Sequence, residues 1–255
     1  MRSSPHVLVV AGSDSSGGAG IARDIATLSH FGVRASLAIT AVTAQTHTAV
    51  IAAETMPPAL VAAQMRAALD ANPIAAIKIG MLATVEIVEA VADMLAGYDT
   101  IPVVLDPVLA STSGTRLLSD AGIDCLRKRL LPAASLVTPN IPELGILSDA
   151  DTTRSHIEIA DQVARLFDNG SASVLVKGGH AEGPQSIDTL YSKGEPRRRF
   201  ASPRRNVALR GTGCMLSSAI AAHLAFGHAI RAAVSQAKTF MDERFDAEAL
   251  TPAKS

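Results

Sequence analysis

Short apolar runs alternate with longer segments of helical pattern along most of the chain. Several of the short runs are continuously apolar, which is typical of parallel strands that are buried on both faces of a sheet. Strands and helices that alternate at this spacing predict right-handed connections between neighbouring parallel strands. We therefore expect an α/β fold of three layers, with a mostly parallel central sheet and helices on both of its faces.

The pattern also assigns bounds to each expected element. Strands are expected at residues 6–11, 33–42, 74–79, 102–106, 135–138 and 173–177. Helices are expected at residues 18–31, 57–71, 84–95, 119–131, 142–147, 155–167, 213–226 and 228–240. A hairpin is expected from 188–192 and 198–201, around Lys193-Gly194. Because no linker or repeat interrupts this order, we expect a single domain over residues 1–255, with a frayed tail after Asp246.

Composition narrows the class of protein. Hydrophobic residues make up 48% of the 255 positions and aromatic residues 3%, so Ala, Val, Leu and Ile must build the core. A net charge of -1 favours neither nucleic acid nor an anionic membrane as a partner. There is no apolar run of about 18 residues and no pattern of a secretory signal. Cys125 and Cys214 are far apart and have no CxxC spacing. We therefore expect a soluble, cytoplasmic protein.

A glycine-rich loop, Gly12 to Gly20, follows the first expected strand and opens a helix. In sheets of this kind ligands bind beyond the carboxyl ends of the strands, where such a loop can offer backbone N–H groups to an anion. It is neither a P-loop nor a dinucleotide fingerprint, because no Gly-Lys-Ser/Thr follows and the glycine spacing differs. A tight structural turn and a ligand-binding loop both fit this pattern.

A second glycine turn, Gly211-Thr212-Gly213-Cys214, leads directly into an alanine-rich helix. Glycines before a helix let backbone N–H groups point at an anion, and the helix dipole adds positive potential. For the same reason we expect the pKa of the Cys214 thiol to be lowered. A buried and inert cysteine is the alternative interpretation.

Acidic and amide side chains follow two consecutive apolar strands. Asp106 ends one of them, and Asn140 and Glu143 follow the next. Hard oxygen ligands of this kind suit Mg²⁺ bound together with nucleotide phosphates. The alternative is a capping box, in which Asn140 caps a helix and Glu143 reaches back to it. Both interpretations can hold at once.

A lysine followed by glycines ends a further apolar strand. Lys177 there can neutralise phosphate as a point charge, and Gly178 and Gly179 permit a close approach of the backbone. His180, the next residue, is expected to be a hydrogen-bonding loop residue rather than a catalytic one. The sequence therefore offers a second candidate contact for phosphate.

Seven stretches in the same order resemble the hydroxymethylpyrimidine/phosphomethylpyrimidine kinases of the ribokinase-like superfamily. They are AGSDSSGGAGIARD (11–24), TAVTAQ (40–45), IKIGML (77–82), VVLDPV (103–108), LLP…VTPNIPE (130–143), VLVKGGH (174–180) and GTGCMLSSAIAA (211–222). The similarity runs from about Val7 to Ala222. It implies a ribokinase-like fold and a phosphotransferase that uses ATP and Mg²⁺. It also implies a substrate, hydroxymethylpyrimidine, which is phosphorylated twice in thiamine biosynthesis.

The resemblance implies roles for single residues as well. An aminopyrimidine pocket would be lined by Gly12, Asp24, Val42, Gln45, Met81 and Val108. Mg²⁺ would be held by Asp106 and Glu143, and nucleotide would be bound by Asn140, Lys177 and Gly179. An anion hole would be formed by Gly211, Thr212, Gly213 and Cys214, with Cys214 assisting the substrate hydroxyl. A homodimer is implied by the resemblance alone.

Three positions depart from the family pattern, and the family's C-terminal tail is not visible. Arg210 stands where the family usually has His, Met215 where it has Thr, and Thr112 where it has Lys. The second phosphorylation is the step most exposed to these changes, because it brings two anionic substrates together. Our hypothesis is that Arg210 compensates. The alternative functions are a pyridoxal or pyridoxine kinase of the same fold and a non-catalytic pyrimidine-binding protein.

Overall fold

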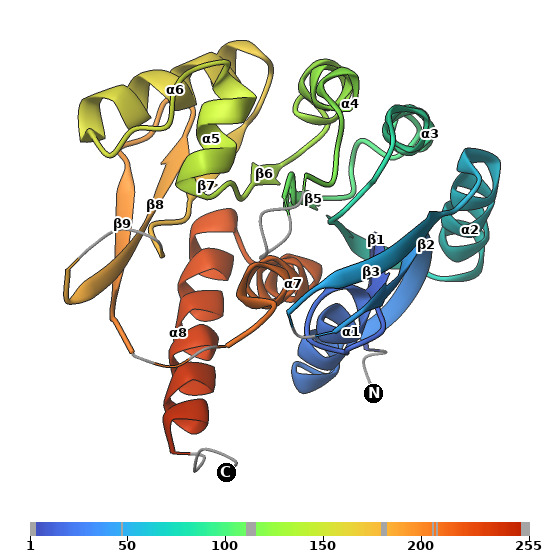
Figure 1. The fold of residues 1–255 in the computed structure, drawn as a ribbon, viewed down its shortest axis with the longest axis horizontal. Helices are drawn as coiled ribbons and strands as arrows, with labels where there is room; N and C mark the ends of the chain where they lie inside the picture. The colour runs from blue at the N-terminus through green and yellow to red at the C-terminus, as the bar shows by residue number, and fades with distance from the viewer. Residues whose placement is uncertain are drawn as a thin grey trace.

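The computed structural model describes residues 4–46, 48–110, 116–179, 183–205, 207 and 209–250. Its strands are β1 (His6–Asp14), β2 (Arg34–Gln45), β3 (Val50–Thr55), β4 (Ile74–Ile79), β5 (Val103–Leu105), β6 (Leu136–Val137), β7 (Ser173–Val176), β8 (Gln185–Ser192) and β9 (Arg198–Pro203). They form one sheet in the order β3-β2-β1-β4-β5-β6-β7-β8-β9 (Figure 1).

The middle of the sheet is parallel. Parallel pairs join six strands, in the order β2, β1, β4, β5, β6 and β7. The outer pairs are antiparallel: β3 joins β2, and the β8–β9 hairpin joins β7. In strand β1, Val9 lies beside Leu37 of β2 on one side and Lys78 of β4 on the other. The expected mostly parallel sheet is confirmed, and the carboxyl ends of its parallel strands share one edge.

Helices cover both faces of the sheet. They are α1 (Gly20–His30), α2 (Pro58–Ala71), α3 (Val85–Leu95), α4 (Asp120–Cys125) with a π-helical turn η1 (Leu126–Leu130), α5 (Ile141–Ser148), α6 (His156–Asp168), α7 (Thr212–Ala225) and α8 (Ile230–Ala249). Helices α1, α7 and α8 lie on one face and α2 to α6 on the other (Figure 1). None of the helices within the described ranges has the length and apolar character that crossing a membrane requires.

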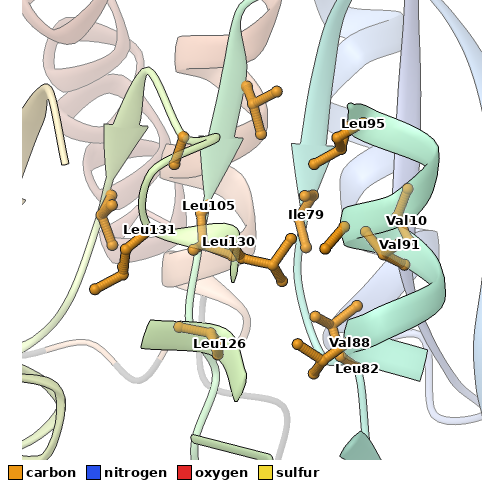
Figure 2. Packing of buried hydrophobic residues seen from close by; sticks show 14 of the residues in the cluster. Val10, Ile79, Leu82, Val88, Val91, Leu95, Leu105, Leu126, Leu130 and Leu131 are labelled. Atoms are coloured by element: carbon orange, nitrogen blue, oxygen red, sulfur yellow. The ribbon is translucent and has the colours of Figure 1, made fainter. Parts of the chain in front are cut away.

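The two faces hold separate cores because strand side chains alternate between them. In β1, Leu8 and Val10 belong to one core, and Val7 and Val9 belong to the other. All four are fully buried, which explains why this strand is continuously apolar. Figure 2 shows part of the first core, where Val10, Ile79 and Leu105 point from three strands toward side chains of α3 and η1.

The structure differs from the expected elements in two places. Strand β3 was not predicted, because its residues are all exposed or partly exposed and so carry no buried apolar face. The frayed tail expected after Asp246 is wrong for residues 247–249, since α8 continues to Ala249. Arg205 explains this second difference, because its guanidinium pairs with Asp242 at 2.9 Å and with Asp246 at 2.6 Å. The single domain over residues 1–255 stays a prediction.

Replacement of Leu105 by Ala is expected to lower the free energy of unfolding by roughly 2–5 kcal/mol, because it opens a cavity in a packed core. Leu105 is fully buried in the middle of the sheet (Figure 2). The matched control is Leu60→Ala on α2, where the leucine is 48% exposed and the loss should stay below about 1 kcal/mol. Urea denaturation measures both values, and equal losses would contradict the assigned core.

Candidate active site

The second turn of α7 places consecutive serines beside two buried carboxylates. Ser218 Oγ donates a hydrogen bond to Asp24 Oδ1 at 2.7 Å. Ser217 Oγ lies 3.3 Å from Asp106 Oδ2 and 2.9 Å from the Gly213 carbonyl oxygen, the nearer acceptor for its one proton. The turn before α7 is equally constrained. Gly211 has a left-handed φ of 70°, and a Cβ added there would come within 2.5 Å of the Gly18 carbonyl oxygen. The second glycine turn therefore packs directly on the first glycine loop.

Asp106 is the centre of a compact charged cluster at the carboxyl edge of the sheet. Lys177 Nζ lies 2.8 Å from Asp106 Oδ1 and 3.9 Å from Glu143 Oε2. Thr138 Oγ1 donates a further hydrogen bond to Asp106 Oδ1 at 3.2 Å. An added Cβ on Gly213 would lie 3.3 Å from Asp106 Oδ2, so glycine lets the start of α7 approach the carboxylate. The structure thus brings together the predicted residues Asp106, Glu143, Lys177 and Gly213.

The charges of this cluster support one another. Burial opposes ionisation of Asp106, but Lys177 and Lys78 outweigh it and hold the pKa of the carboxyl below its usual range. Burial likewise opposes the charge on Lys177, and Asp106 and Glu143 outweigh it, so the lysine pKa is raised. Burial raises the pKa of Glu143 even though Lys177 is near. At neutral pH the cluster therefore presents at least one carboxylate and one ammonium group.

Asn140 and Glu143 form the capping box that the sequence allowed. Glu143 N donates to Asn140 Oδ1 at 2.8 Å, and Asn140 N donates to Glu143 Oε2 at 2.9 Å. The same Glu143 oxygen faces Lys177, so this residue both caps α5 and belongs to the charged cluster.

Gly179 lies in the loop after β7, where its carbonyl accepts a hydrogen bond from Arg204 Nη1 at 2.6 Å.

The expected low pKa of Cys214 is wrong. Burial raises the pKa of this thiol to about 11, although the positive charge of Lys78 acts in the opposite direction. The N-terminus of α7 favours a thiolate, but loss of hydration around the sulfur outweighs that effect. Cys214 therefore carries its proton at neutral pH in the unliganded protein.

The residues predicted to line a pyrimidine pocket are only partly brought together. An added Cβ on Gly12 would lie 2.5 Å from Met81 Cε, so these two positions touch. On the neighbouring strand β2, Val42 pairs with Ser13 and is 46% exposed. The Gln45 N–H donates to Ser15 Oγ at 2.9 Å, which places Gln45 beside the first loop.

Val108 and Asp24 differ from that group. Val108 has a φ of 45°, a conformation that costs free energy for a β-branched residue and is concentrated at functional sites. Asp24 is fully buried, and Lys78 and Ser218 already occupy its oxygens. The pocket-lining role of Asp24 stays a prediction that its burial does not favour.

Sequence reasoning missed Lys78 and both serines of α7. Lys78 is fully buried in β4, and its Nζ lies 2.9 Å from Asp24 Oδ1. A lysine inside an otherwise apolar strand was the available signal, because a buried ammonium group needs a partner. No comparable signal marked Ser217 and Ser218, which stand in an ordinary alanine-rich helix.

Arg210 contacts the first loop rather than the charged cluster around Asp106. Its Nη1 donates to Ser16 Oγ at 3.0 Å and to the Thr46 carbonyl at 3.4 Å, and its Nη2 lies 3.7 Å from Asp14 Oδ2. The guanidinium thus joins the loops that follow β1 and β2 to the turn before α7. Thr112, His180 and residues 251–255 lie outside the described residues, so the expectations for them are untested.

Comparison with solved structures identifies the class. The pyridoxal kinase of Bacillus subtilis, solved as an ADP complex, aligns with a TM-score of 0.84 and 30% identity over 93% of this chain and 90% of its own. A phosphomethylpyrimidine kinase from Clostridium difficile aligns with a TM-score of 0.83 and 34% identity over 94% and 99%. The fold is therefore that of a ribokinase-like small-molecule kinase.

The sequence comparisons narrow the class to a family. Residues 14–254 match the family model described as phosphomethylpyrimidine kinase. A hydroxymethylpyrimidine/phosphomethylpyrimidine kinase of Salmonella typhimurium is 42% identical, over 92% of this chain and 92% of its own. The Escherichia coli enzyme of that name is 44% identical over 85% and 82%. The chain belongs to the phosphomethylpyrimidine kinase family, as its sequence motifs predicted.

Alkylation of Cys214 by iodoacetamide tests the raised pKa of its thiol. In a Cys125→Ser protein the rate should rise about tenfold for each pH unit up to about pH 9.5, because the reactive thiolate is a minor species throughout. Mass spectrometry of the labelled peptide measures this rate, with an unstructured cysteine peptide as the control. A rate that reaches its plateau near neutral pH would show a lowered pKa and contradict the account.

Proposed function

We propose that this protein uses ATP and Mg²⁺ to phosphorylate hydroxymethylpyrimidine and then its monophosphate, in thiamine biosynthesis. The observation that carries the proposal is the Gly211–Cys214 turn, which opens α7 beside Asp106 and Lys177. Family membership supports it, and so do relatives whose names state both substrates. Some relatives are bifunctional thiamine biosynthetic proteins, including one from Geobacter sulfurreducens, which supports the pathway.

The geometry suits phosphoryl transfer, which depends mainly on positioning and on neutralising charge. Backbone N–H groups in the first turn of α7 have no partner within the helix and can bind phosphoryl oxygens. Lys177 lies beside this turn, since its Nζ is 3.5 Å from the position of a Cβ on Gly213. The ammonium group can therefore pair with a nucleotide phosphate next to the glycine turn.

Asp106 and Glu143 fit the role of Mg²⁺ ligands. Among the described residues no group of three or more His, Cys, Asp or Glu side chains forms a metal site. Mg²⁺ is commonly held by one or two carboxylates together with substrate phosphates, so a pair of carboxylates suffices. Bound Mg²⁺ would neutralise charge on the phosphates of the nucleotide. In that state the ammonium group of Lys177 would leave its ion pair with Asp106 and pair with a nucleotide phosphate.

The protonated thiol of Cys214 favours a place in the anion hole over that of a resting thiolate base. With a pKa of about 11, its S–H group can donate a hydrogen bond toward the reacting oxygen. For the pyrimidine itself, the side-chain amide of Gln45 offers both a donor and an acceptor. Gly12 and Met81 would supply the apolar wall that they already form together.

Pyridoxal is the second candidate substrate. Pyridoxal kinase from Staphylococcus aureus, solved with pyridoxal, aligns with a TM-score of 0.86 and 29% identity over 95% of this chain and 88% of its own. The pyridoxal ring, like that of hydroxymethylpyrimidine, carries a hydroxymethyl group. Relatives named for the pyrimidine substrates are more similar in sequence, at 42% and 44% identity, and favour the first assignment.

We further propose a cytoplasmic homodimer built from one domain per chain. Both cysteines are free, which fits a reducing compartment. For the dimer, the edge strand β3 offers a row of exposed residues, among them Ile51 at 72% exposure. Such an edge is suited to pairing with another chain.

Turnover of ATP to ADP should be measured with hydroxymethylpyrimidine, its monophosphate and pyridoxal as separate substrates. Both pyrimidines should be consumed, and removal of Mg²⁺ by EDTA should abolish turnover and readdition restore it. The matched variants are Cys214→Ala, expected to lower kcat by about 10²-fold or more, and Cys125→Ala, expected to leave it unchanged. Activity on pyridoxal alone, or pyrimidine binding without turnover, would refute the proposal.

Replacement of Arg210 by Ala tests whether this residue compensates for Thr112. The second phosphorylation should slow by about tenfold while the first changes less, because loss of the guanidinium affects an anionic substrate more strongly. Arg210→Lys should restore part of the loss, since it keeps the charge. The kcat/KM values for the alcohol and its monophosphate measure the difference, and no change in either step would rule out the hypothesis.

A further inference from the structure

A fully buried polar network lies beneath the second turn of α7. Lys78 Nζ in β4 is 2.9 Å from Asp24 Oδ1 and 3.0 Å from Asp24 Oδ2, and Asp24 belongs to α1. Ser218 of α7 donates its hydroxyl to Asp24 Oδ1 at 2.7 Å. All three side chains are completely inaccessible to solvent. The network therefore joins the central sheet to two helices of one face.

Stability alone gives a poor reason for keeping such a pair in the core. Removing two charges from water costs free energy that their attraction often does not repay, and apolar residues of similar volume serve as well or better. The surroundings are nevertheless fitted to the lysine. A Cβ on Gly80 would lie only 2.9 Å from Lys78 Nζ, so this glycine leaves room for the ammonium group. A role beyond packing is indicated.

The network acts on the part of α7 that carries Cys214. Ser218 stands four residues after Cys214, so the two side chains lie on the same side of the helix one turn apart. The bond from Ser218 to Asp24 therefore fixes the helix one turn after the thiol. The charges that act on this thiol are those of Lys78, Asp24, Asp106 and Lys177. Of these, Lys78 favours the thiolate and Asp24 disfavours it.

A similar arrangement holds the other side of the same turn. Ser217 Oγ lies 3.3 Å from Asp106 Oδ2, and Lys177 neutralises Asp106. Each carboxylate thus lies beside one of two consecutive serines and pairs with one lysine. Asp106 lies in the cluster proposed to bind nucleotide and Mg²⁺, whereas Asp24 is sealed from solvent.

We propose that Lys78, Asp24 and Ser218 are positioning residues: they hold α7 one turn after Cys214, keep its first turn in register for phosphoryl transfer, and act on the thiol through two opposite charges. The positioning half of this inference rests on the proposed kinase activity. The electrostatic half does not, because the reactivity of the thiol can be measured without any substrate.

The charge is tested by iodoacetamide alkylation of Cys214 at one fixed pH, in a Cys125→Ser background. Lys78→Met should slow the reaction about tenfold, and Asp24→Asn should speed it by a similar factor. The double variant removes both charges together, is expected to fold, and should return close to the parent rate. Single variants that shift in the same direction, or a double variant far from the parent, would overturn the electrostatic role.

The positioning role is tested with Ser218→Ala, which keeps the ion pair intact. Its kcat should fall about tenfold with little change in KM for either substrate, because the first turn of α7 is less well fixed during transfer. Val91→Ala is the matched control, since it removes fully buried atoms from the opposite core. It should lower the melting temperature and leave kcat unchanged.

Outcomes of the two experiments are separable. An unchanged kcat in Ser218→Ala, or an equal loss in Val91→Ala, would overturn the positioning role. If the parent enzyme turned over no substrate at all, the proposed function would fail. The alkylation rates would still decide whether the charges of Lys78 and Asp24 act on the Cys214 thiol. If a single charge variant failed to fold by circular dichroism, the double variant and Ser218→Ala would decide the question.

Discussion

The fixed position of the start of α7 is the constraint on which the site depends. In its second turn Ser218 binds Asp24 and Ser217 lies beside Asp106. Lys78 of β4 neutralises Asp24, and Lys177, directly after β7, neutralises Asp106. Breaking one partner out of a buried pair typically costs about 3–5 kcal/mol, so the arrangement tolerates little displacement. The glycine turn that precedes α7 is thereby held against the first loop.

The sheet supplies the positions for this arrangement. Lys78 comes from β4, whereas Asp106 and Lys177 directly follow β5 and β7, three strands of one parallel sheet. Their carboxyl ends share one edge, and α7 begins there, on the face that also carries α1 (Figure 1). Residues separated by up to 194 positions, such as Asp24 and Ser218, meet in this arrangement. Charge neutralisation and backbone donors are thus assembled at a single place.

The sequence allowed the parallel strands and several site residues to be predicted for one reason. Continuous apolar runs mark strands buried on both faces, and polar residues that directly follow them, such as Asp106 and Lys177, must reach the ligand-binding edge. Strand β3 was not predicted because it buries no apolar face. The Lys78–Asp24 pair joins residues 54 positions apart, and the pKa of Cys214 depends on its burial, so both require the folded structure.

The most direct test of the account is a crystal structure with Mg²⁺, a non-hydrolysable ATP analogue and hydroxymethylpyrimidine. The account predicts that the terminal phosphate and the hydroxymethyl oxygen meet at Gly211–Cys214, with Lys177 turned toward phosphate and Lys78 still paired with Asp24. Phosphates bound away from this turn would contradict it. So would ligand in the surface hollow of about 550 Å³ at the opposite end of β1, lined by residues such as His6, Arg34 and Asn72.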